Sequence, residues 1–129
     1  MATWTKDELH KIAAAEELEL ASLCGDGTLS KAVTIWVVRV GDDLYVRSWK
    51  GDSGAWFRAT QARHQGHINA GGVGKDVAFV GEADRDINDR IDAAYQSKYR
   101  RHGGRYVDPM VALTARATTI KLVPRSNIA

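Results

Sequence analysis

Hydrophobic and polar positions near the N-terminus follow first a helical and then an extended period. Thr5 and Glu8 have the spacing of a capping box, which predicts a helix that begins at about Lys6. From position 17 the period becomes two, so that Leu18 and Leu20 share one face until a Gly-Asp-Gly turn is reached. The pattern predicts one helix followed by a half-buried strand.

The centre of the chain has the pattern of an antiparallel hairpin. Residues 32–40 are mostly β-branched or aromatic, a Gly-Asp-Asp turn follows, and residues 44–49 alternate again. Both faces of the first strand are apolar, which favours a sheet interior or a barrel wall beneath a covering helix. The four residues from Ile35 to Val38 are therefore core candidates.

Three more strands are predicted beyond this hairpin, at residues 67–70, 77–82 and 116–123. A short helix is expected to begin near Trp56, and a longer one to run from Asp84 or Asp86 to the glycines at 103 and 104. Together these elements give six strands and two or three helices. At 129 residues the chain suits one domain, residues 1–129, that is mainly β with flanking helices.

Lys98 continues the apolar stripe of the longer helix, which is otherwise formed by Ile87, Ile91, Ala94 and Tyr95. A lysine on such a face usually carries its ammonium group to the edge of the apolar surface. The alternative is a cation directed into a binding site or at a buried carboxylate. The sequence leaves both interpretations of Lys98 open.

Composition narrows the class of partner. The net charge is +2, with 18 basic and 16 acidic residues interspersed, which favours a small-molecule ligand over a nucleic acid or a membrane. There is one cysteine, no apolar signal segment at the N-terminus, and no apolar run near the roughly 20 residues that span a bilayer. These features predict a cytoplasmic protein without an internal disulfide.

Several segments resemble known ligand-binding or catalytic motifs but lack the residues or the spacing that these motifs require. GGVGKD at residues 71–76 lacks the first glycine and the final Ser or Thr of a phosphate-binding P-loop, so it is interpreted as a hairpin turn. His64 and His67 are three residues apart in an extended pattern and have no further ligands nearby, so no metal site is predicted. Cys24 is interpreted as a packing residue. No catalytic residue is identified.

The segment LYVRSWKGDSGAWFR, residues 44–58, combines cations, hydroxyls and glycines within one loop. Phosphate groups are bound by such cations and hydroxyls, together with exposed backbone N–H groups and helix N-termini. The alternative interpretation is an ordinary solvated loop, whose Arg and Lys pair with Asp42, Asp43 or Asp52. The candidate site residues in this segment are Arg47, Ser48, Lys50, Gly51, Ser53, Gly54, Trp56 and Arg58.

Residues 44–62, LYVRSWKGDSGAWFRATQA, resemble the segment of split-barrel flavin- and deazaflavin-binding proteins in which a strand ends in a Ser/Lys/Gly loop before a helix. The resemblance extends to VTIWVVRVGDDLYVRS, HINAGG, DVAFVGEAD, IDAAYQSKY and ATTIKLVP, which follow the order of a small bacterial family of unknown function. That family is part of the pyridoxamine-phosphate-oxidase-like superfamily. The resemblance covers nearly the whole chain.

This resemblance implies a six-stranded antiparallel Greek-key split barrel that forms a homodimer and binds FMN or a deazaflavin in a groove between subunits. Trp36, Val37 and Val38 would lie along the ring system, and Ser48, Lys50 and Arg58 would hold the phosphate. The implied activity is reduction of a small molecule by the bound cofactor. One departure is that Lys31 is the only basic residue just before the hairpin, where longer relatives carry more.

Two other functions remain open at this point. A split barrel that binds a cofactor or another planar ligand without catalysis would have the same sequence features. A nucleic-acid-binding module would use aromatic stacking with basic residues, but the only basic cluster is RRHGGR at 100–105. Trp49 and Tyr106 are surplus aromatic residues that suit a dimer interface.

Overall fold

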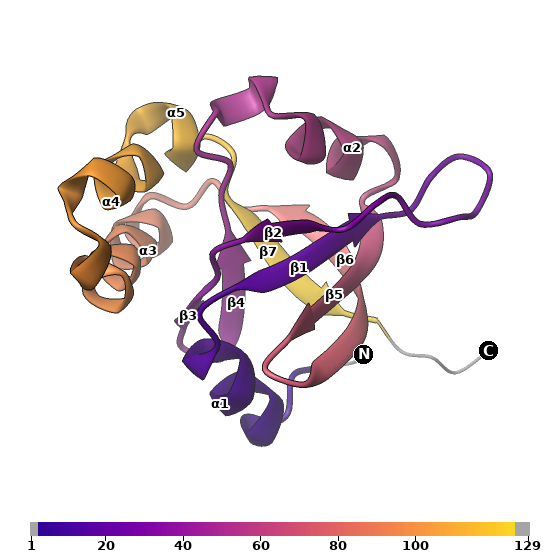
Figure 1. Cartoon of the computed structure of the whole chain (residues 1–129), viewed down its shortest axis with the longest axis horizontal. Coiled ribbons are helices and arrows are strands. Elements are labelled where there is room, and N and C mark those ends of the chain that lie inside the picture. Colours follow the sequence, from indigo (N-terminus) through magenta and orange to yellow (C-terminus); the bar gives the residue numbers. More distant parts are fainter. Residues whose placement is uncertain (1–2, 126–129) are drawn as a thin grey trace.

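The computed structural model describes residues 3–125, in which a strongly curved antiparallel sheet is flanked by helices (Figure 1). The strands are β1 (Leu18–Ser22), β2 (Val33–Ile35), β3 (Val38–Val40), β4 (Asp43–Val46), β5 (Gln65–Ala70), β6 (Val73–Gly81) and β7 (Ile120–Pro124). The helices are α1 (Lys6–Ala14), α2 (Ala55–Arg63), α3 (Arg85–Lys98), α4 (Gly104–Val111) and α5 (Leu113–Arg116), with two short 3-10 helices, η1 (Gly51–Ser53) and η2 (Arg100–His102). None of the helices in this part of the chain is long and apolar enough to cross a membrane.

The two edge strands of the curved sheet, β2 and β3, are consecutive in the chain. The strand order is β2-β1-β5-β6-β7-β4-β3, with every pair antiparallel. Only Trp36 and Val37 separate the end of β2 from the start of β3, so the two edges of the sheet meet at this point. The mainly β fold with flanking helices is confirmed, and it is of the split-barrel class. The count of six strands is corrected to seven, because the strand expected over residues 32–40 is broken at Trp36–Val37.

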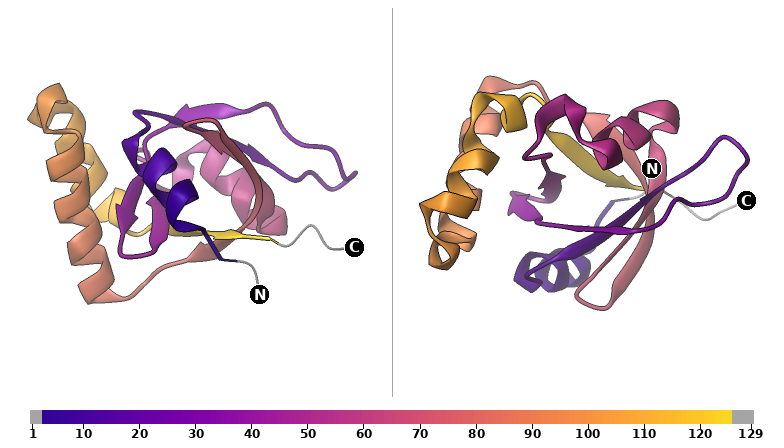
Figure 2. Two further views of the ribbon diagram at one scale, coloured as in Figure 1. Left: turned by 90° about the horizontal axis from the view of Figure 1, so that it is seen from below. Right: turned by 45° about the horizontal axis from the view of Figure 1, so that its top comes forward.

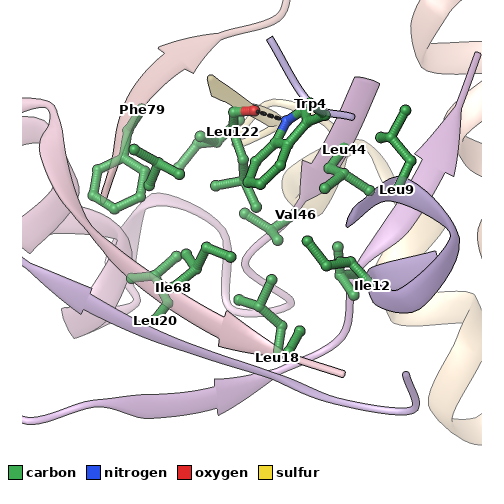
Figure 3. Packing of buried hydrophobic residues seen from close by; sticks show 14 residues of the cluster. Trp4, Leu9, Ile12, Leu18, Leu20, Leu44, Val46, Ile68, Phe79 and Leu122 are labelled. Atoms are coloured by element: carbon green, nitrogen blue, oxygen red, sulfur yellow. Dashed lines mark hydrogen bonds between the residues drawn. The ribbon is translucent and has the colours of Figure 1, made fainter. Parts of the chain in front are cut away.

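The barrel interior holds the main apolar core. Leu18, Leu20, Leu44, Val46 and Ile68 are almost inaccessible to solvent, and their side chains converge inside the barrel (Figure 3). Helix α1 closes one end of the barrel, and its predicted capping box between Thr5 and Glu8 is present. The Trp4 indole packs in the same core and donates a hydrogen bond to the Leu122 carbonyl at 2.9 Å. This bond joins the N-terminal segment to the last strand.

A second apolar cluster lies outside the barrel wall, beneath helices α3 and α4. Tyr45 points into it, whereas its neighbours Leu44 and Val46 point into the barrel, as the period of two requires. Val38 and Val40 of β3 join Tyr45 in this outer cluster, together with Tyr95 and Tyr99 of the helical side. Figure 2 shows α3, α4 and α5 as one layer beside the barrel. The predicted wall beneath a covering helix is present at β3, whereas Ile35 and Trp36, also predicted as core residues, are only partly buried.

The C-terminal helices differ from the prediction. Helix α3 begins after Asp84, whose side chain accepts a hydrogen bond from the Ile87 N–H, but it ends at Lys98 instead of reaching Gly103. The glycine pair at 103 and 104 begins α4, with Gly103 as its N-cap. The pair was interpreted only as a helix end, so α4 and α5 were missed. The buried Val107 and Met110, three residues apart, are the helical signal that was available.

Candidate functional site

A cavity of about 740 Å³ opens between the β2–β3 break, helix α2 and helix α4. Aromatic side chains dominate its walls, since three of the four tryptophans and one tyrosine contribute to it. The lining residues are Val33, Thr34, Ile35, Trp36, Arg47, Trp49, Trp56, Arg105, Tyr106, Pro109 and Met110. A volume of this size suits a drug-sized or cofactor-sized ligand.

Trp36 is held in place by the end of helix α3. Its indole stacks on the Tyr99 ring, with ring centroids 3.9 Å apart and planes 2° from parallel. The backbone of the next residue is also satisfied from this helix, because the Val37 N–H donates to Tyr99 Oη at 3.1 Å. Lys98 Nζ donates to the Val37 carbonyl at 2.7 Å. The strand break therefore leaves neither polar group of Val37 unpaired, and it presents Trp36 to the cavity.

Lys98 matches neither of the two interpretations that the sequence left open. Its ammonium group binds a backbone carbonyl, and it also lies 5.1 Å from the centroid of the Tyr99 ring. Burial lowers the pKa of Lys98 to about 8, against an ordinary value of 10.5. Lys98 is not part of the cavity lining that the described residues form. We therefore assign it to the support of the strand break.

Val37 and Val38 do not face the cavity. The Val37 side chain is buried in the barrel core, and the Val38 side chain is buried in the outer cluster beneath α3. Of the three residues expected along a ring system, Trp36 alone contributes to the lining. The two valines are core residues, as their strand pattern predicted, and their expected place along a ring system is corrected. They lie in different clusters because consecutive side chains in an extended chain point to opposite sides.

Arg47 is a structural residue, which corrects its expected part in phosphate binding. Its guanidinium is fully buried and pairs with Asp92 at 2.5 Å. The remaining N–H groups donate to the Thr119 hydroxyl, the Met110 carbonyl, and the carbonyl and side-chain oxygen of Asn88. All five donors of the fork are used inside the fold, so none is left for a ligand. The expected pairing with Asp42, Asp43 or Asp52 is also absent for Arg47 in this structure.

The glycines of the loop serve close packing. A Cβ on Gly54 would lie 2.5 Å from Ser48 Oγ, so this close approach of the loop to Ser48 favours glycine at position 54. Gly51 has a φ of +66° and packs against Thr114. The Ser48 N–H donates to the Thr118 hydroxyl at 2.9 Å, and the Ser53 hydroxyl donates to the Lys50 carbonyl at 2.8 Å. These contacts make the segment an ordered turn into α2.

The structure does not gather the predicted phosphate residues around a cavity. Ser48, Lys50 and Arg58 do not contribute to the lining of this cavity within the described part of the chain. Lys50 Nζ lies 5.3 Å from the centroid of the Trp49 ring, and Arg58 is exposed on α2. Arg58 follows Trp56 by two positions, and residues at that spacing lie on different faces of a helix. Of the candidate residues in the segment at 44–58, Trp56 and the buried Arg47 contribute to the cavity lining.

Two lining residues at the start of α4 were not predicted as site residues. Arg105 and Tyr106 enter the lining together, and the Arg105 guanidinium carbon is 5.9 Å from the centroid of the Tyr106 ring. The sequence had indicated Tyr106 as a surplus aromatic residue and Arg105 as part of a basic cluster. Arg105 and Tyr106 reach the cavity as residues of α4, a helix that the sequence analysis did not predict.

A second cavity of about 610 Å³ lies on the other side of α2. Phe57 contributes to it, whereas the preceding Trp56 contributes to the aromatic cavity. Two arginines, Arg85 and Arg116, contribute to its wall, and Arg116 is paired with Asp89 and Asp92 at 2.8 Å each. Within residues 3–125 there is no group of three His, Cys, Asp or Glu side chains placed to hold a metal ion.

The lining of the aromatic cavity is rich in aromatic side chains and contains few titratable ones. Its lining within the described chain contains no aspartate, glutamate, histidine, lysine or cysteine. The Tyr106 hydroxyl is the one side-chain group there with the chemistry of a weak acid.

Residues 8–122 match a family model described as an uncharacterized protein conserved in bacteria, DUF2255. No curated protein matches the chain. Among solved structures, Campylobacter jejuni ChuZ is similar with a TM-score of 0.65 at 12% identity, over 92% of this chain and 50% of that one. The chain thus spans about half the length of that relative.

Two further solved structures have the same fold. A candidate pyridoxamine 5′-phosphate oxidase from Listeria innocua has a TM-score of 0.61 at 16% identity, with 92% of this chain and 90% of that one covered. An FAD and heme binding protein from Mycobacterium smegmatis has a TM-score of 0.53 at 18% identity, with 94% and 65% covered. At these identities the likeness shows the fold, which is the split barrel that the sequence resemblance predicted.

Proposed function

The chain belongs to the DUF2255 family of bacterial proteins and has a split-barrel fold, and from this premise we propose that it binds a flavin-type cofactor in the aromatic cavity. The proposed activity is reduction of a small molecule by bound FMN or a deazaflavin. FAD is named for one protein of similar fold, which supports this choice. The proposed location is the cytoplasm.

The observation that carries the proposal is the fixed indole at the strand break. Trp36 stacks on Tyr99 and at the same time contributes to the cavity wall. A ring bound in the cavity would extend this aromatic pair, with Trp56 and Tyr106 in the remaining walls. The Trp36 indole is held before a ligand arrives, so this side chain loses little conformational entropy on binding.

The proposal predicts that Trp36→Ala weakens FMN binding. Loss of one base-sized stacking contact costs about 1–3 kcal/mol, which is about five- to 150-fold in dissociation constant. Isothermal titration calorimetry with FMN would measure the change in both proteins. Trp4→Phe is the matched control, because Trp4 lies in the barrel core and outside the cavity.

Equal FMN affinity in the wild type and in Trp36→Ala would contradict the assignment of the ring to this cavity. A Trp36→Phe variant separates stacking from folding, since it keeps a ring on Tyr99 and is expected to retain most of the affinity. Circular dichroism of each variant confirms that the barrel is folded.

Cofactor binding without catalysis is the second candidate function. It is favoured by the absence of acid or base side chains from the described cavity lining. A reduced flavin that passes electrons to nitroaromatic or quinone acceptors only when the protein is present would identify an enzyme. A protein that binds the flavin but leaves its oxidation rate unchanged would be a carrier. A heme titration followed by its visible absorption tests the other cofactor named for a protein of this fold.

A homodimer is proposed together with this function. Trp49 and Tyr106 are 60% and 58% exposed at the edge of the cavity. Exposed aromatic residues of this size are enriched at interfaces between protein chains. A second copy seated on them would narrow the cavity and shield a bound ring from water.

A further inference from the structure

The lining of the aromatic cavity carries positive charge without a carboxylate to balance it. Two of its eleven residues are arginines, and none is an aspartate or glutamate within the described chain. Arg47 is neutralised by Asp92 and uses every donor inside the fold. The uncompensated charge is that of Arg105.

Arg105 is exposed near the start of α4, and its side chain makes no hydrogen bond or ion pair with residues 3–125. Nearby Arg101 differs, because it is paired with the Glu16 carboxylate. The closest carboxylate along the helix is that of Asp108, which packs beside Gly104 and does not contribute to the cavity. The donors of Arg105 therefore remain open toward a ligand.

A guanidinium at the edge of an apolar cavity favours anionic groups as its ligands. Its planar fork binds phosphate or carboxylate through two parallel hydrogen bonds, which are stronger where aromatic walls exclude water. The walls of this cavity select a flat ring, and Arg105 adds a site for an anionic group at the α4 side. Lys50 and Arg58 offer their charges outside the lining.

We propose that Arg105 binds the anionic group of the ligand that occupies the aromatic cavity. This makes the cavity selective for planar aromatic ligands that carry a phosphate or carboxylate over the same ring without one. The inference rests on the proposed function, because it concerns the same cavity. The proposal places the anionic group of the ligand beside α4, and not beside the loop at residues 48–54.

Riboflavin and FMN test this directly, since they share one ring system and differ by a phosphate. The wild type is expected to bind FMN more tightly than riboflavin. Arg105→Ala is expected to lose about tenfold to 100-fold in FMN affinity, as for removal of a charged hydrogen-bond partner, while riboflavin affinity stays unchanged. Arg105→Lys keeps the charge without the fork and is expected to lie between the two.

Arg100→Ala and Arg58→Ala are the matched controls, because each removes one exposed arginine outside the cavity lining. Both are expected to keep the wild-type preference for FMN. The inference is overturned if Arg105→Ala retains that preference, or if Lys50→Ala or Arg58→Ala abolishes it. It is also overturned if the wild type binds both ligands equally, although the cavity assignment then stands. A wild type that binds neither flavin removes the proposed function and this inference together.

Discussion

At the scale of single residues, Arg47 shows how a buried charge fixes the geometry of the site. Its fork joins β4 to α3 through Asn88 and Asp92, to α4 through the Met110 carbonyl, and to the segment before β7 through Thr119. A buried ion of this kind is costly to leave unpaired. Through the Met110 carbonyl the network also contacts α4, the helix that carries Arg105 and Tyr106.

Arg47→Ala is expected to lower the free energy of unfolding by about 3–5 kcal/mol, because it leaves buried acceptors without a donor. Arg47→Lys retains the charge but supplies three donors instead of five, so a smaller loss is expected. Urea unfolding followed by tryptophan fluorescence measures both. Arg58→Ala, an exposed arginine, should stay within about 0.5 kcal/mol of the wild type. Similar stabilities for Arg47→Ala and Arg58→Ala would show that the network contributes little.

At the scale of elements, the break between β2 and β3 is the feature that connects fold to site. The end of α3 stabilises it through Tyr99 and Lys98, which satisfy the backbone of Val37. Lys98 is half-buried there, and burial lowers its pKa to about 8. The unfolded chain, with an ordinary lysine pKa, binds this proton more tightly than the folded one.

The stability contribution of Lys98 is therefore expected to rise with pH between about 8 and 10.5. In that window the unfolded state holds the proton that the folded state has lost. The difference in unfolding free energy between the wild type and Lys98→Met should grow as pH rises from 8 to 10. The buried tyrosines have raised pKa values, so their ionisation lowers the unfolding free energy at higher pH. This contribution is common to both proteins and cancels in the difference between them. A pH-independent difference would show that Lys98 titrates normally.

Sequence patterns predicted the elements whose signals are local. The capping box at Thr5, the cap at Asp84 and the β5–β6 turn are each determined by neighbouring residues, and each is present. The break at Trp36–Val37 was missed, because the hydrogen bonds that permit it come from Lys98 and Tyr99, about sixty residues away. The cavity lining follows the same rule, since Trp56 was a candidate from the loop motif, whereas the place of Arg105 depends on tertiary packing of α4.

At the scale of the whole molecule, the aromatic cavity is bounded by exposed aromatic residues that suit an interface. Trp49 and Tyr106 lie at its edge, and Leu113 of α5 is 83% exposed. A homodimer that covers the cavity edge would bury these side chains and complete the enclosure of a bound ring. The family resemblance implies such a groove between subunits.

Sedimentation velocity is expected to show a dimer for the wild type. The double variant Trp49→Ala/Tyr106→Ala should shift the population toward monomer, because large aromatic contacts dominate interface energies. Leu29→Ala, an exposed apolar residue outside both cavities, is the control and should sediment as the wild type does. A wild type that remains monomeric at high concentration would contradict the interface.

The most direct test of the central claim is the emission of free FMN during titration with the wild-type protein. An isoalloxazine ring that stacks on an indole loses its fluorescence, so a bound ring beside Trp36 is expected to be strongly quenched, with saturation at one ring per chain. Flavin emission that stays constant throughout the titration would contradict the assignment of the aromatic cavity as a flavin site.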